Sequence, residues 1–113
     1  MNPKLITLEA IRDAHTRIAA GLRPTPCAVS APLSAAAGMI VFAKHDYLQA
    51  TGSFKERGAR HALACLDEAQ RRRGVVAASA GNHALGLAWH GRELGIAVTV
   101  VMPRHAPRVQ AGR

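Results

Sequence analysis

The sequence predicts an α/β fold, and three observations lead to that prediction. Residues 75–79 and 97–102 are short apolar runs with the length of buried strands, and residues 82–94 between them have the pattern of a helix. A helix that connects two continuous apolar strands favours parallel pairing with a right-handed crossover, so we expect a βαβ unit over 75–102. The composition agrees, because 49% of the residues are hydrophobic and only 4% are aromatic, which suits helices and buried strands more than an all-β sandwich.

In the first 50 residues we expect a helix, an extended segment, a short helix and a strand. Thr7 is a suitable N-cap for a helix that runs to about residue 20, and Gly21 ends it. Residues 23–26 contain two prolines, each of which biases the preceding residue away from helix, so this segment is expected to be extended. A short helix over 33–37 and a buried strand over 39–43 follow.

A turn-rich loop at 49–53 precedes the second long helix, and Ser53 is a candidate cap for it. This helix is expected to run to about residue 64 and to continue or restart up to Gly74. The arginines at 71–73 are expected to form its solvated last turn, where positive charge offsets the helix dipole. Residues 104–113 are expected to be a loop or a tail.

Charge and cysteine usage limit the class of protein. The chain has 15 Lys+Arg against 7 Asp+Glu, a formal net charge of +8, which permits a nucleic-acid partner or an acidic substrate. The arginines are scattered, however, and there is no nucleic-acid motif and no set of aromatic residues for stacking on bases. Cys27 and Cys65 lack metal-ligand spacing, so we expect reduced thiols in a cytoplasmic protein and no metal site. No apolar run is long enough to span a bilayer, and the N-terminus lacks the apolar region of a signal peptide.

One stretch places a lysine in an unusual position. Lys55 follows a Gly-Ser turn at 52–53 and lies just inside the N-terminus of the predicted helix. The free N–H groups of a helix start carry partial positive charge and disfavour a cation there. A lysine whose amine loses its proton readily is what Schiff-base chemistry needs. On this stretch alone, an ordinary solvent-facing lysine is the alternative.

A second stretch, residues 79–84, lies at a predicted strand-to-helix junction. Its small residues let the backbone approach a ligand, and the free N–H groups of the helix start can hold a carboxylate or a phosphate. Ser79 and Asn82 add side-chain hydrogen bonds at the carboxyl end of a parallel strand, where ligands bind. A capped turn with no ligand is the alternative. The stretch is neither a Walker A loop nor a dinucleotide fingerprint, so nothing supports NAD.

Together these stretches resemble the pyridoxal-phosphate enzymes of fold type II, most of all the threonine (serine) dehydratases and serine racemases. The likeness keeps its order and spacing over roughly residues 22–109. It implies that Lys55 forms the Schiff base with the cofactor, that Phe54 packs beside it, and that Asn82 donates to the cofactor's 3′-oxygen. The loop that receives the substrate carboxylate is implied to consist of Ser79, Gly81, Asn82 and His83.

The reaction implied by the resemblance is loss of water from L-threonine or L-serine, which gives a 2-oxo acid and ammonia. Racemases of this type place a serine directly before the Gly-Asn-His sequence as a second base. This chain has Ala80 there, which has no proton to give, so the likeness favours dehydration over racemisation. Two other positions depart from the pattern: Asp46 stands where glutamate is more common, and Leu85 replaces a common glutamine.

The likeness covers only the N-terminal portion of such an enzyme, so we expect an incomplete fold type II fold. Residues 1–50 would form an N-terminal arm and the first large-domain elements, and residues 51–113 the lysine helix and part of the small domain. The resemblance implies that the glycine-rich loop for the cofactor phosphate lies outside these 113 residues. We therefore expect a truncated dehydratase, poorly stable and inactive alone. One chain of a split enzyme and a small basic non-catalytic binding protein are the alternatives.

Overall fold

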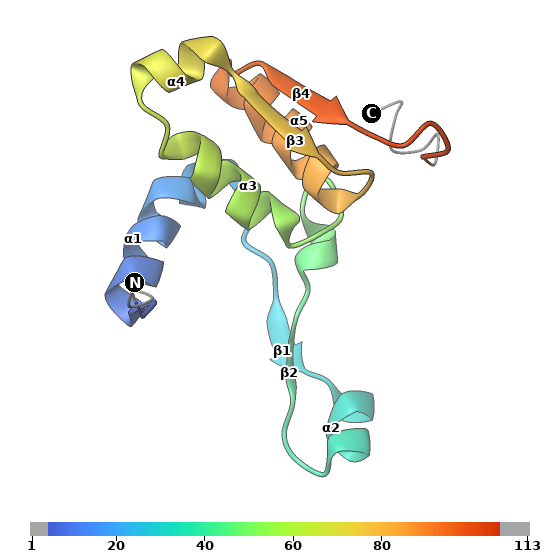
Figure 1. Ribbon diagram of the computed structural model, residues 1–113. Coiled ribbons are helices and arrows are strands. Elements are labelled where there is room, and N and C mark those ends of the chain that lie inside the picture. The colour runs from blue at the N-terminus through green and yellow to red at the C-terminus, as the bar shows by residue number, and fades with distance from the viewer. Residues whose placement is uncertain (1–4, 107–113) are drawn as a thin grey trace.

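The computed structural model describes residues 5–106, which form a helical and sheet-containing body from which a hairpin projects (Figure 1). No helix among these residues is long and apolar enough to cross a membrane. The body contains α1 (Leu8–Ile18), α3 (Lys55–Ala64), α4 (Glu68–Arg73), β3 (Val75–Ala78), α5 (Asn82–Leu94) and β4 (Val98–Val101). The hairpin contains β1 (Cys27–Val29), α2 (Ala31–Ala37) and β2 (Phe42–Lys44).

The predicted βαβ unit is confirmed. β3 pairs in parallel with β4, in a register that runs from Val75 opposite Val98 to Ala78 opposite Val101. α5 connects the two strands and begins and ends where the sequence predicts. Gly95 ends the helix because its left-handed conformation, with φ of 66°, is open to glycine and strained for other residues. The fold class is therefore α/β.

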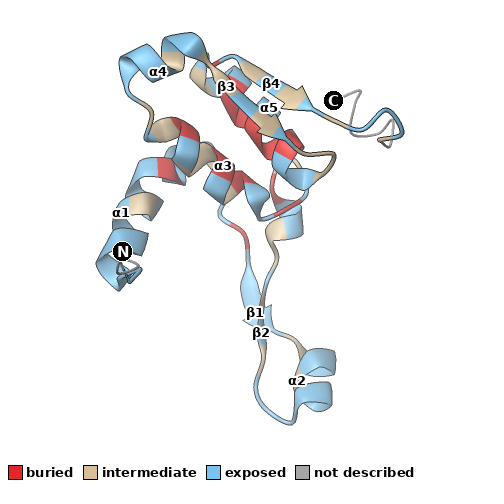
Figure 2. Ribbon diagram, in the orientation of Figure 1, coloured by how far each residue is buried: buried red, intermediate tan, exposed pale blue. Residues whose placement is uncertain are grey.

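The core lies where α3 crosses α5, and the buried residues gather in these two helices (Figure 2). Ala59 and Leu63 from α3 pack with Leu87 from α5. The crossing is close because Gly86 of α5 has no side chain. A Cβ at this position would lie 3.3 Å from the Cβ of Ala59 and 3.4 Å from the carbonyl of Lys55. Gly86 thus sets how near the start of α3 approaches α5.

The predicted buried strand over 39–43 is wrong in both position and burial. The strand is β2, it begins at Phe42, and it pairs antiparallel with β1. Ile40 is 74% exposed and Phe42 is 63% exposed. The apolar pattern of these residues predicted a buried strand, but no second layer covers the hairpin in the part of the chain that the structure describes. α2 also begins earlier than expected, because Ser30 caps it by accepting from the N–H of Leu33.

The helices around the core agree with the prediction in one respect and differ from it in two. α1 ends at Ile18 and not at about residue 20, and a 3-10 turn over Ala19–Gly21 follows it. The second long helix restarts as α4, which is one of the two expected courses, because Asp67 and Gln70 form a reciprocal capping box. Arg71 is not a solvated member of the last turn. It is half-buried and donates to the carbonyls of Ala64 and Leu66 at the C-terminal end of α3, whereas Arg72 and Arg73 are exposed as expected. Residues 104–106 form a turn, and 107–113 lie outside the described residues.

Candidate active site

Lys55 is the first residue of α3, as the sequence predicts. Its backbone N–H donates to the hydroxyl of Ser53 at 3.3 Å. The Ser53 hydroxyl therefore accepts from the first backbone N–H of α3, although Ser53 lies one residue before the N-cap position. The N-cap residue itself is Phe54, which makes no side-chain cap hydrogen bond. The Lys55 side chain is exposed, and its ammonium lies 5.5 Å from the centre of the Phe54 ring. A primary amine and an aromatic ring thus lie side by side at a helix start.

The loop between β3 and α5 is built of small residues. The Ser79 N–H donates to the carbonyl of Val101 at 3.1 Å, which keeps the loop on the sheet, and the Ser79 hydroxyl accepts from the N–H of Gly81 at 3.3 Å. Gly81 is the N-cap residue of α5 and provides no side chain to its first turn. Asn82 and His83 open the helix and are exposed. The first-turn N–H groups of α5 therefore have no side-chain cap, and such groups suit an anion.

The crossing at Gly86 brings the two stretches together. Asn82 lies four residues before Gly86, one helical turn away on the same face of α5. Because the Lys55 carbonyl would lie 3.4 Å from a Cβ at Gly86, the backbone of Lys55 is about one turn from Asn82. The starts of α3 and α5 thus converge beside the carboxyl end of β3 (Figure 1). Ligands of open α/β sheets bind at this end of the strands.

The carboxyl ends of β3 and β4 form a shallow hollow next to this convergence. It is lined by Ala78, Ser79, Ala80, Val101, Met102 and Pro103. Ser79 and Ala80 therefore face a surface that a ligand can reach. The exposed side chains of Lys55 and Asn82 do not belong to this lining. The predicted site residues therefore lie in one region of the surface, but the described residues do not enclose them in a pocket.

A pair of charged side chains fixes the segment that leads to Lys55. Asp46 and Arg57 form two hydrogen bonds, at 2.7 and 2.9 Å, and the hydroxyl of Thr25 donates to the same carboxylate at 2.7 Å. The Arg57 guanidinium holds the pKa of Asp46 far below its ordinary value of 3.8, and the carboxylate raises the pKa of Arg57. The buried side chain of Gln49 adds a second tie, since it bonds both the N–H and the carbonyl of Arg23.

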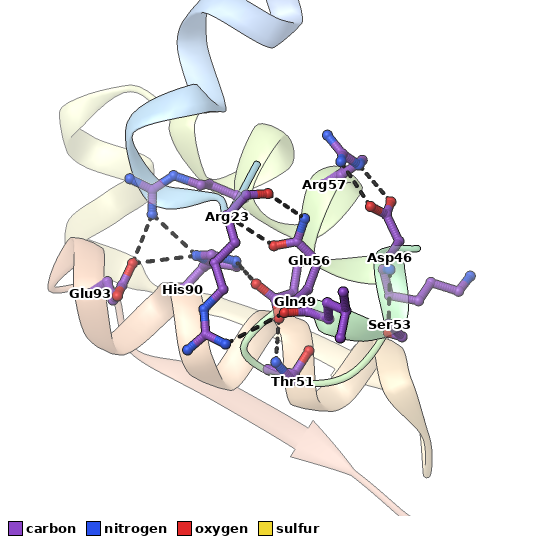
Figure 3. Close-up of polar contacts among 12 residues, drawn as sticks. Arg23, Asp46, Gln49, Thr51, Ser53, Glu56, Arg57, His90 and Glu93 are labelled. Carbon is purple, nitrogen blue, oxygen red and sulfur yellow. Dashed lines mark hydrogen bonds and ion pairs between the residues drawn. The ribbon is translucent and has the colours of Figure 1, made fainter. Parts of the chain in front are cut away.

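A buried polar network lies below the turn that leads to Lys55, and it was not predicted from the sequence (Figure 3). Glu56 and His90 are 1% and 0% exposed, and they contact each other at 3.1 Å. The helical period contained a signal for Glu56, which precedes Ala59 and Leu63 by three and seven residues and so shares their core-facing side. His90 follows Gly86 by one turn and lies on the same face of α5.

The fold and the site define a class of α/β protein in which an exposed lysine at a helix start lies beside a small-residue loop at the end of a parallel strand. Residues 18–113 match the family model described as pyridoxal-phosphate dependent enzyme. The chain belongs to this family, whose cofactor is pyridoxal phosphate.

Individual relatives agree with this assignment. The chain is 48% identical over 103 residues to the L-threonine ammonia-lyase of Thermotoga maritima, a match that covers 91% of this chain and 26% of the relative. It is 50% identical over 104 residues to the L-threo-3-hydroxyaspartate ammonia-lyase of a Pseudomonas species, covering 92% and 33% of the two chains. The crystal structure of the Dictyostelium discoideum serine racemase superimposes with a TM-score of 0.87 at 37% identity, over 95% of this chain and 35% of that one.

These matches confirm that the chain has part of a fold type II pyridoxal-phosphate enzyme fold. It spans about a quarter to a third of the length of the relatives described.

Proposed function

We propose that this chain forms the lysine-bearing part of a pyridoxal-phosphate-dependent ammonia-lyase that removes water from L-threonine or L-serine. The observation that carries the proposal is the placement of Lys55 at the start of α3, against Gly86 and about one turn from Asn82. Relatives named as ammonia-lyases, at 48% and 50% identity, support the reaction class.

The residues present fit the cofactor by their chemistry. Lys55 offers an exposed primary amine, which binds an aldehyde covalently, and Phe54 offers an aromatic surface beside it. Asn82 offers an amide that would donate to the cofactor's 3′-oxygen. When bound, pyridoxal phosphate supplies an electron sink for the negative charge left as the substrate loses its α-proton.

The chain's own residues then have separate tasks. The Lys55 amine would hold the aldehyde group of the cofactor, and the same amine would take the α-proton of the substrate. The uncapped first-turn N–H groups of α5 receive the substrate carboxylate, helped by the positive end of the helix dipole. Ser79, Gly81, Asn82 and His83 shape that subsite. The carboxylate thus fixes the orientation of the α-carbon toward Lys55.

Ala80 favours dehydration over racemisation. Racemisation requires a second group that returns a proton to the opposite face of the α-carbon, and the methyl group of Ala80 cannot do so. Because serine racemases are among the structures that this chain resembles, the products must be compared directly. We expect 2-oxo acid formation to exceed formation of the D-amino acid.

A chimeric enzyme tests the proposal. This chain replaces the matching 103 residues of the Thermotoga maritima L-threonine ammonia-lyase, and 2-oxobutyrate, pyruvate and D-serine are measured. We expect an active lyase in which Lys55→Ala lowers kcat by about 100-fold or more. Lys44→Arg, on the hairpin, is the matched control and should leave kcat within about twofold. A Lys55→Ala chimera with full activity would contradict the proposal.

A further inference from the structure

A chain of hydrogen bonds runs beneath the turn that leads to Lys55 (Figure 3). Glu56 follows Lys55 directly and points away from solvent into the α3–α5 crossing. One oxygen of its carboxylate accepts from the N–H of Thr51, so the side chain closes the turn from the inside. The other oxygen lies 3.1 Å from Nε2 of His90. The turn that presents Lys55 is thereby tied to the middle of α5.

Arg60 fixes the direction of these hydrogen bonds. Its guanidinium lies 3.1 Å from Nδ1 of His90 and 3.0 Å from the carboxylate of Glu93. A guanidinium has only donors, so Nδ1 of His90 must accept, and the ring proton of the neutral imidazole resides on Nε2. His90 then donates to Glu56. Donation therefore runs from Arg60 to His90 to Glu56, which also accepts from Thr51.

The network has room for Arg60 only because Gly21 lacks a side chain. A Cβ at Gly21 would lie 1.7 Å from the central guanidinium carbon of Arg60. The 3-10 turn after α1 therefore covers the outer end of the network. This packing orients the guanidinium toward Nδ1 of His90.

We propose that Glu56 is a positioning residue for Lys55 and that His90 and Arg60 hold it as an acceptor. The inference rests on the proposed function, because the position of Lys55 matters only where its amine binds the cofactor. A carboxylate suits this place since it accepts from two donors at once and lies in the first turn of α3, where the helix dipole favours negative charge.

An amide in place of the carboxylate tests the directionality. In Glu56→Gln the amide oxygen still accepts from Thr51, but the amide NH₂ then faces the Nε2 proton of His90. Moving that proton to Nδ1 turns it toward the Arg60 guanidinium at 3.1 Å, which is nearer than the Glu93 carboxylate at 3.6 Å, so the conflict persists. Arg60→Met removes the donor at the far end, which lets His90 carry its proton on Nδ1 and accept from the new amide. The double variant should therefore restore what Glu56→Gln loses.

The three lysines of the chain provide the readout. The purified 113-residue chain is incubated with pyridoxal phosphate and reduced with borohydride, and the label on each lysine is quantified by peptide mass spectrometry. Lys4 and Lys44 serve as internal references. In the wild-type chain we expect Lys55 to be labelled in preference to the other two lysines. Labelling of Lys55 should fall about tenfold in Glu56→Gln, the effect of losing one buried hydrogen bond, and should recover in Glu56→Gln/Arg60→Met. Unchanged labelling in Glu56→Gln, or no recovery in the double variant, would overturn the proposal.

Amide hydrogen exchange separates this proposal from the proposed function, because it needs no cofactor. The Thr51 amide should exchange about tenfold faster in Glu56→Gln and regain protection in the double variant. If the Lys55→Ala chimera keeps full activity, the proposed function fails, and exchange at Thr51 still decides whether Glu56 fixes the turn. Equal exchange in all the variants would overturn the positioning role.

Discussion

Alanine substitutions at three helical glycines test how closely the helices and the sheet pack. Alanine is favoured over glycine in a helix by about 1 kcal/mol, so each substitution gains that much stability before any packing cost is counted. At Gly58, on α3, an added Cβ meets no atom within 4 Å. At Gly86 it lies 3.3 to 3.4 Å from Ala59 and the Lys55 carbonyl, which requires a small shift. At Gly91 it lies 2.4 Å from Val98 and 2.9 Å from a backbone carbonyl.

The expected free energies of unfolding therefore form a series. Gly58→Ala should stabilise the chain by about 1 kcal/mol. In Gly86→Ala a packing cost of about 1 kcal/mol offsets the helical gain, so the net change should be near zero. Gly91→Ala should destabilise by about 2 kcal/mol, since a close approach to backbone costs about 3 kcal/mol. Urea unfolding followed by circular dichroism measures the series. Equal stabilisation at Gly58 and Gly86 would refute the close crossing of α3 and α5.

Two further substitutions address charge and core. The depressed pKa of Asp46 means that its contribution to stability is fully present above its ordinary pKa of 3.8 and is lost progressively as the pH falls below that value toward the lower pKa of the folded state. Asp46→Asn should therefore cost about 2 kcal/mol of unfolding free energy near neutral pH and should flatten the loss of stability below about pH 4. Urea titrations across this range check it, with the exposed Asp13→Asn as control, and an unchanged acid slope would contradict it. Leu63 is 1% exposed, so Leu63→Ala leaves a cavity in the core and should lower the free energy of unfolding by about 3 kcal/mol. Leu5 is 88% exposed, so Leu5→Ala should leave the free energy of unfolding almost unchanged.

The elements that could be predicted from the sequence are those with local signals. The boundaries of α5 follow from Gly81 and Gly95 and from the apolar runs on either side, and the structure agrees with them. The position of Lys55 at a helix start follows from the Gly-Ser turn before it. In each case the deciding interactions lie within a few residues of the chain, so propensity and turn chemistry were sufficient.

The features that could not be predicted depend on packing between distant segments. The apolar residues of the hairpin give the pattern of a buried strand, but Ile40 and Phe42 are exposed, because burial depends on what covers a strand and not on the strand itself. Glu56 and His90 are 34 residues apart, and their contact exists only because α3 crosses α5. Arg71 looked like a surface charge, yet it binds the last carbonyls of the preceding helix.

Gly21 shows that one glycine can resemble others in sequence and differ from them in effect. Gly38 and Gly95 end helices in the left-handed conformation, so replacing them strains the backbone locally. Gly21 has no such φ, and a methyl group there would displace the guanidinium of Arg60 instead. In a complete mutational scan, the effects of substitutions at Gly21 should therefore resemble those at Arg60, which lies 39 positions further along the chain. They should differ from the effects of substitutions at Gly38 and Gly95.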